Sequence, residues 1–333
     1  MLDRNFIVRG GLAAALAVGL AAAPVSADEI EVEEVIVAEE VVAEVVEPCP
    51  ECPNNNGAVS FAVGSDITNA YFFRGILQEK NGFIWQPWGE VTFNVWSGEG
   101  IINDVSLTLG TWNSIQTEQT GSPGDGNGPG NWYESDIYAG VAVGLPYNLS
   151  AGITYVAYTS PNNAFGTVQE IDLDASYDDS GMYSGQLADL GFSTNPYAIV
   201  AFEFDKTAFG GDEGIYMELG AEPAVTVMQE SDYPITVGMP LTLGLSLDNY
   251  YKPSNAPNGS NPGDDTFGYA TVGLSAAVPL SFMPANLGSF SAGLSGKWIA
   301  LGSNLQRVNV GITDPTDGKF SDWIGTFSVN WEY

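Results

Sequence analysis

Between Ile235 and Asp248, apolar side chains alternate with small or polar ones seven times in succession. A period of two places the two kinds of side chain on opposite faces of a β-strand. A soluble sheet can show the same alternation, but a usual strand has only about five or six residues. The length of this run, rather than its period, is what sets the chain apart.

The end of the chain repeats the pattern over residues 321–333, with aromatic and aliphatic side chains on one face and polar ones on the other. This ending resembles the terminal strand of bacterial outer-membrane barrels, which serves as their assembly signal. The resemblance assigns that role to Phe327, Val329, Trp331 and Tyr333.

The same pattern predicts about 12 strands, an even number as single-chain bacterial barrels require. They are expected near 58–79, 83–97, 101–116, 132–145, 148–160, 167–178, 195–205, 214–228, 234–249, 267–281, 289–303 and 321–333. Short turns should alternate with longer outer loops, and most connections obey this rule. Two do not: 179–194 is long for a periplasmic turn, and 79–82 is short for an outer loop.

Aromatic residues near the predicted strand ends match the two interfacial girdles of a membrane barrel. The outer girdle is expected to contain Trp85, Trp112, Trp132, Tyr133, Tyr158, Tyr250, Tyr251, Tyr269 and Trp323. The inner one is expected to contain Trp96, Tyr147, Tyr177, Tyr197, Trp331 and Tyr333. These observations favour an all-β, antiparallel, up-and-down transmembrane barrel over a secreted β-sandwich.

Composition agrees with a membrane barrel. Charged residues make up 15% of the chain, against about 25% in soluble domains. The mature chain has no apolar run of about 18 residues, so no transmembrane helix is expected. A net charge of −32 makes nucleic acid and anionic lipid poor partners, because both would be repelled, and it favours cations; no nucleic-acid partner is expected.

The N-terminal part divides into two segments. Residues 1–27 combine basic residues, a short apolar stretch and a small-residue cleavage site, as secretory signal peptides do. Residues 28–57 are rich in Val and Glu and end in an Asn-Asn-Asn-Gly linker to the barrel domain, 58–333. This periplasmic segment is either a solvated acidic linker or an element that contacts a periplasmic partner or enters the lumen.

Cys49 and Cys52 lie within that segment as a C-x-x-C pair. In the oxidising periplasm a local disulfide is the simplest interpretation. Half of a metal site shared with a second chain is the alternative, because the chain offers no further Cys and no His. A thioredoxin-like role lacks its βαβ context. No cofactor or resident metal is expected.

The first predicted strand contains Val63-Gly64-Ser65-Asp66, followed by Tyr71-Phe72-Phe73-Arg74-Gly75-Ile76. This opening resembles the TorF family of bacterial porins, over about 20 residues. That family keeps the Asp and the aromatic-Arg-Gly nearly adjacent, whereas Ile67-Thr68-Asn69-Ala70 intervenes here. The resemblance implies a porin-like barrel without a defined substrate, and it assigns Asp66 and Arg74 to the lumen.

If the apolar faces meet lipid, the polar faces line the lumen. They contribute mainly carboxylates, with few cations opposite them. The expected lumen residues are Asp66, Arg74, Glu134, Asp136, Glu170, Asp172, Asp174, Glu203, Glu218, Glu222 and Lys297. An acidic wall favours the entry of cations, unless these groups pair with one another and fill the lumen as a plug.

Carboxylate clusters also suggest an outer-membrane hydrolase. Most such enzymes use His near neutral pH, and this chain has none. Nothing marks a glycosidase-like pair either, so an enzyme is not expected. The predicted function is passive diffusion of small, cationic solutes through a porin in the bacterial outer membrane. Its partners would be lipid, the barrel-assembly machinery and the solutes; a non-conducting anchor or adhesion barrel is the alternative.

Overall fold

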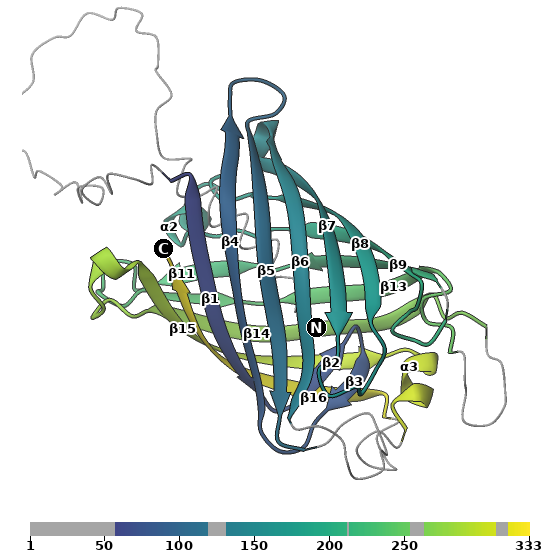
Figure 1. The fold of residues 1–333 in the computed structure, drawn as a ribbon. Coiled ribbons are helices and arrows are strands. Elements are labelled where there is room, and N and C mark those ends of the chain that lie inside the picture. Colours follow the sequence, from purple (N-terminus) through teal and green to yellow (C-terminus); the bar gives the residue numbers. More distant parts are fainter. Residues whose placement is uncertain (1–56, 119–130, 212, 254–262, 311–318) are drawn as a thin grey trace, which may run out of the picture.

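The computed structural model describes residues 57–118, 131–211, 213–253, 263–310 and 319–333 (Figure 1). They form a closed antiparallel barrel of 12 wall strands, which confirms the predicted fold and strand number. Two wall strands are each interrupted, so the sheet contains 14 assigned strands. No helix among the described residues has the length and apolar character needed to cross a membrane.

The wall follows chain order, and each strand pairs with its sequence neighbours. Its strands are β1 (Val59–Thr68), β4 (Ile84–Ser97), β5 (Asp104–Gln116), β6 (Trp132–Leu145), β7 (Leu149–Thr159), β8 (Val168–Tyr177), β9 (Tyr197–Phe204), β10 (Gly214–Ala221), β11 (Ala224–Val227), β12 (Ile235–Gly238), β13 (Leu241–Asp248), β14 (Phe267–Pro279), β15 (Ser289–Leu301) and β16 (Ser321–Glu332). The last strand closes the ring by pairing with the first, with Ala62 opposite Glu332.

The two faces of the wall differ as the alternation predicts. In β8, Ile171 and Leu173 are 37% and 46% exposed on the outside. Glu170 and Asp172 alternate with them along the strand and are buried on the lumen side. A closed ring leaves no unpaired sheet edge, and an apolar exterior suits lipid, so the wall has the two properties that a membrane requires of a barrel.

Two strands predicted as continuous are each broken at a proline. β10 and β11 are separated at Pro223, and β12 and β13 at Pro240. Proline has no N–H for the ladder and is therefore confined to edges and irregularities of a sheet. The two breaks face each other, because Met239 N donates to Pro223 O at 2.8 Å.

The connection 179–194, which is long for its predicted periplasmic side, contains local structure of its own. It contains a short helix, α2 (Gln186–Asp189), and its later residues pair with the interrupted strand. Ser193 and Ala224 form an antiparallel bridge, and Thr226 N donates to Leu190 O at 2.8 Å. The segment therefore extends the wall beside the Pro223 break. The other periplasmic turns are short and include the 3-10 turns η1 (Pro146–Asn148) and η2 (Ala285–Leu287).

The prediction of a single strand over 58–79 is wrong. β1 ends at Thr68, and the chain then forms a small separate hairpin of β2 (Tyr71–Phe73) and β3 (Ile76–Glu79). The hairpin lies within the ring of wall strands at its outer end, near helix α3 (Ser303–Val308) (Figure 1). The first outer connection is thus long rather than short, and it folds into the lumen.

The outer aromatic girdle is correct only in part. Trp85, Trp132 and Trp323 face outward and are 38%, 50% and 64% exposed. The remaining predicted members are buried inside: Trp112, Tyr133, Tyr158, Tyr250, Tyr251 and Tyr269. They belong to one apolar cluster with the hairpin residues, so the hairpin packs against these rings.

Candidate functional site

The hairpin is anchored on several sides of the lumen. Tyr71 packs against Trp112 with ring centroids 5.4 Å apart, and its hydroxyl donates to Glu134 at 2.8 Å. Phe73 packs against Tyr158 at 5.7 Å. These residues come from β5, β6 and β7, so the hairpin bridges one side of the wall through aromatic contacts.

The opposite side holds the hairpin through its backbone. Asn309, at the end of α3, accepts from Leu77 N and donates to Gly75 O, both at 3.0 Å. Tyr251 donates its hydroxyl to Arg74 O at 3.1 Å. A side-chain amide that pairs with both an N–H and a C=O makes the same two hydrogen bonds as a neighbouring strand. Asn309 therefore fixes the position of the hairpin in the lumen.

Arg74 lies at the hairpin tip and is 5% exposed. Its Nη1 and Nη2 donate to the two oxygens of Glu170 at 2.7 and 3.0 Å. Nη1 also lies 3.7 Å from Glu203 Oε1. A bidentate, buried pair of this kind is among the stronger polar interactions in proteins.

Aromatic residues complete the surroundings of Arg74. Its Cζ lies 4.1 Å from the Tyr216 ring centroid, and Nη1 donates to the Tyr250 hydroxyl at 2.9 Å. Tyr158 donates to Glu170 Oε1 at 2.8 Å. We call this set the guanidinium cage: Tyr158, Glu170, Glu203, Tyr216 and Tyr250. It combines opposite charge, planar hydrogen bonding and ring-face contact, the three interactions that suit a guanidinium.

Burial raises the pKa of the Tyr250 phenol well above its ordinary value, although the nearby Arg74 charge lowers it. The Tyr250 phenol is therefore neutral at physiological pH. Glu170 and Glu203 are the two carboxyl groups of the cage, and both lie beside the Arg74 guanidinium.

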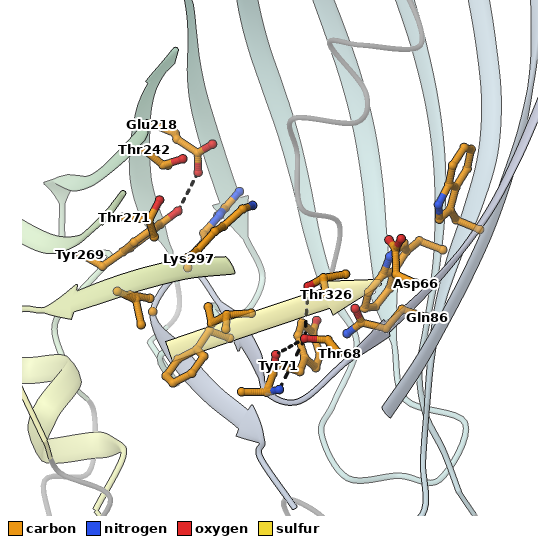
Figure 2. Close-up of a pocket in the computed structure, with 18 residues that line it drawn as sticks. Asp66, Thr68, Tyr71, Gln86, Glu218, Thr242, Tyr269, Thr271, Lys297 and Thr326 are labelled. Atoms are coloured by element: carbon orange, nitrogen blue, oxygen red, sulfur yellow. Dashed lines mark hydrogen bonds between the residues drawn. The ribbon is translucent and has the colours of Figure 1, made fainter. Parts of the chain in front are cut away.

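Cavities lined by the described residues lie within the barrel on both sides of the hairpin. An outer cavity of about 460 Å³ lies against Phe73 and is also lined by Glu134, Phe165 and Lys206. A small cavity of about 130 Å³ lies on the other side, beside Arg74. Figure 2 shows it between Glu218, Tyr269 and Lys297 on one wall and Asp66 and Gln86 on the other.

An inner cavity of about 460 Å³ occupies the half of the lumen at the end where β1 begins and β16 ends, which is the predicted periplasmic end. It shares Asp66, Lys297 and Thr326 with the small cavity, so the two adjoin. Most of its lining is small: Ser176, Ser193, Ala224, Thr226, Thr236, Ser275, Ala276, Ala277, Gly293, Ser295, Thr326 and Ser328. The inner and small cavities thus extend from the inner end of the lumen to the hairpin, where side chains fill the lumen.

The structure places the predicted lumen residues at two levels. Arg74, Glu134, Asp136, Glu170, Asp172, Glu203 and Glu218 are buried around the hairpin. Asp66, Glu222 and Lys297 line the inner or small cavity. Asp174 continues the row of Glu170 and Asp172 and lies over Gly152 of the neighbouring strand.

Sequence reasoning missed several residues of this site. Glu90 shares a strand face with Gln86 and Trp88 and is buried beside Tyr138, to which it is hydrogen-bonded at 3.0 Å. Its alternation with Val91 could have revealed it. Tyr158 and Tyr216 also lie on polar strand faces, whereas no local pattern marks Asn309.

Other predictions fall elsewhere. The signal peptide, the acidic segment 28–56, Cys49 and Cys52 lie outside the described residues. Phe327 and Val329 face outward on β16, while their role as an assembly signal stays a prediction, as do that of Trp331 and Tyr333. Across the described ranges, no group of three or more His, Cys, Asp or Glu residues is arranged to hold a metal ion.

Closure of the wall, its lipid-suited exterior and its acidic, partly hollow interior together define a bacterial outer-membrane β-barrel. No protein-family model matches the chain, and no curated protein matches it. The resemblance to TorF porins therefore stays a prediction.

Solved structures similar in fold are outer-membrane barrels. The NanC porin covers 81% of this chain and 98% of its own at 10% identity, with a TM-score of 0.39. An outer membrane channel from Pseudomonas putida covers 83% and 95% at 11% identity and 0.42. LpxR from Salmonella typhimurium covers 82% and 99% at 7% identity and 0.43. At this distance the likeness concerns architecture and carries no conclusion about activity.

Proposed function

We propose that the protein is a diffusion channel for small cations, in which the β2–β3 hairpin is the closing element of an otherwise hollow barrel. The observation that carries the proposal is the placement of the inner and small cavities, which lead from the periplasmic half of the lumen to the hairpin. Beyond the hairpin the outer cavity begins. Removing one short, locally folded segment would join the three.

Charge supports cations as the solute. Asp66 and Glu222 line the inner passage, and Asp174 lies on the lumen face of β8 near its inner end. Lys297 opposes them as a cation of the same passage. A confined, water-filled passage with excess negative charge concentrates cations and repels anions.

The test is the reversal potential of the refolded mature chain in a planar bilayer under a KCl gradient. Discrete conductance steps with a cation-selective reversal potential are expected. The triple variant Asp66→Asn, Asp174→Asn, Glu222→Gln should shift that potential toward zero, because the passage loses three negative charges. Asp178→Asn is the control, because it also removes a negative charge but lies in the connection that follows β8 rather than among the residues that line the inner cavity.

A second function is favoured by the depth of the hairpin anchoring. The hairpin is held by backbone and side-chain contacts from several wall strands, as in a permanently closed barrel that serves as an anchor or adhesion platform. A correctly folded barrel that stays silent at every voltage, with and without the hairpin, would overturn the channel and favour this alternative.

A further inference from the structure

We propose that the guanidinium cage is a solute-binding site, which Arg74 occupies as an internal ligand and which small guanidinium compounds can occupy in its place. This inference deepens the proposed function, on which it rests, by naming the class of cation. The cage recognises the shape of its ligand as well as its charge.

The first argument is the chemistry of the occupied cage. Glu170 engages two nitrogens of the bound guanidinium at 2.7 and 3.0 Å, which a single ammonium cannot reproduce. Tyr216 covers its face at 4.1 Å. Glu203 Oε2 is positioned by Ala208 N at 3.1 Å. The receptor groups are thus held by the wall and outer loops, while the ligand group arrives from a separate element.

The second argument is the way the ligand group is presented. Arg74 has φ +45°, in the left-handed region that glycine adopts without strain. The arginine is followed by Gly75, so the tip is a two-residue turn that carries one long side chain into the cage. The contacts of the guanidinium with the cage offset the backbone cost at this position.

The third argument is access. Phe73, whose ring lies 5.0 Å from the Arg74 Cζ, also lines the outer cavity. Arg74 itself lines the small cavity on the other side. Phe73 and the Arg74 guanidinium therefore lie between the two cavities, and the guanidinium separates the small cavity from the cage around it. A solute that displaces Arg74 would both bind there and release the hairpin tip.

The experiment is chemical rescue of Arg74→Gly, with methylguanidinium as the probe and methylammonium as its control. Glycine suits the backbone at this position and leaves the cage empty. Methylguanidinium at ten times its dissociation constant should raise the folded-to-unfolded ratio of the variant about tenfold. The same concentration should change the wild type several-fold less, because Arg74 occupies the site. Methylammonium should rescue neither.

The double variant Arg74→Gly, Glu170→Gln supplies the specificity control, since it removes the bidentate partner and should abolish rescue. Rescue equal with both compounds, or surviving this substitution, would overturn the inference. If Arg74→Gly refolds only with methylguanidinium present, that is rescue. If Arg74→Gly refolds under no condition, the inference is tested on the wild type in bilayers. Methylguanidinium should then raise its open fraction in bilayers several-fold over methylammonium, and equal responses would overturn the inference.

This stability readout does not depend on conduction. A silent barrel that shows rescue would refute the channel and keep the site. A cation-selective barrel without rescue would keep the channel and refute the site.

Discussion

The two halves of the lumen are built by the same strands and the same alternation, yet among the described residues a hairpin packs into the outer half, beside its cavity, and none packs into the inner half. In the outer half the inward residues are large, such as Trp112, Tyr158 and Tyr216, and a hairpin packs among them. In the inner half they are mostly Ser, Thr, Ala and Gly, and a cavity of about 460 Å³ is left. The size of inward side chains along each strand, not the strand number alone, sets where a barrel of this width is open.

The halves also differ in how charge is held. Around the hairpin, carboxylates such as Glu170 and Glu203 are buried and face a buried arginine. In the inner half, Asp66 and Glu222 line a cavity. The same residue type therefore fastens a closing element in one half and sets the potential of a passage in the other.

The largest expected effect comes from removing the filling of the outer half. Thr68 and Ile84 are paired across β1 and β4, so residues 69–83 can be replaced by a short Gly-Ser linker without stretching the wall. Conductance in planar bilayers should rise several-fold over that of the full chain, and closures should be lost. A variant with unchanged conductance would show that the outer half is blocked by something other than the hairpin.

The next effect separates the two kinds of carboxylate by stability. Glu170→Gln removes the charge that Arg74 faces at 2.7 Å, and loss of one partner of a buried pair costs about 3 to 5 kcal/mol. Asp174→Asn lies on the same strand face but is only half-buried, and it should cost less than about 1 kcal/mol. Denaturant unfolding in micelles, followed by tryptophan fluorescence, measures both. Equal losses would mean that the halves do not differ in this respect.

A smaller effect is expected from filling the inner half. In the barrel without its hairpin, Ser328→Trp should lower conductance by roughly half, because the side chain enters the inner cavity and a passage conducts according to its width. Phe327→Trp is the matched control, since residue 327 is 42% exposed on the outer face. Conductance that is insensitive to Ser328→Trp would place the ion path elsewhere.

The smallest effect concerns Asp179, in the connection 179–194 that follows β8. Asp179 accepts from Thr194 N at 2.7 Å and Asn195 N at 3.0 Å. Burial acts to raise its pKa, but these hydrogen bonds, with those from the Thr194 and Tyr183 hydroxyls, outweigh it and lower the pKa from 3.8 to about 2. A lowered pKa means stability that is present above about pH 4 and lost as the pH falls toward 2.

Wild-type protein should accordingly be more stable than Asp179→Asn by about 1 to 2 kcal/mol at pH 5. The difference should shrink as the pH falls through 2, because the carboxyl then becomes protonated in the folded state as well as in the unfolded one. Thermal unfolding of the two proteins side by side cancels the titration of other groups. A difference that is constant with pH would show that these hydrogen bonds do not depend on the charge.

The sequence was enough for the wall but not for the hairpin. Alternation located the strands and assigned the carboxylates to one face of each strand, because both follow from period two. It could not locate the end of β1, because Tyr71–Glu79 continues the apolar and aromatic character of a strand after the chain has left the wall. The turn residues Asn69 and Gly75 were the only local signals.

The contacts within the site could not be predicted from the sequence, for a different reason. Arg74 and Glu170 are 96 residues apart, and no local pattern connects them. The aromatic girdle failed because position at a strand end gives the depth of a ring but not its face. For Tyr158, the parity set by Ile153 and Tyr155, both exposed, would have placed it inside.

The sequence separations in the hairpin also impose an order in time. The hairpin is synthesised directly after β1, yet its partners Glu170, Tyr250 and Asn309 follow far later in the chain. Contacts at such separations carry a large loop-closure entropy and form slowly. We therefore expect the hairpin to dock late, after the ring of strands around it has formed. An unfinished ring, which lacks those partners, would leave the arginine at the tip in water.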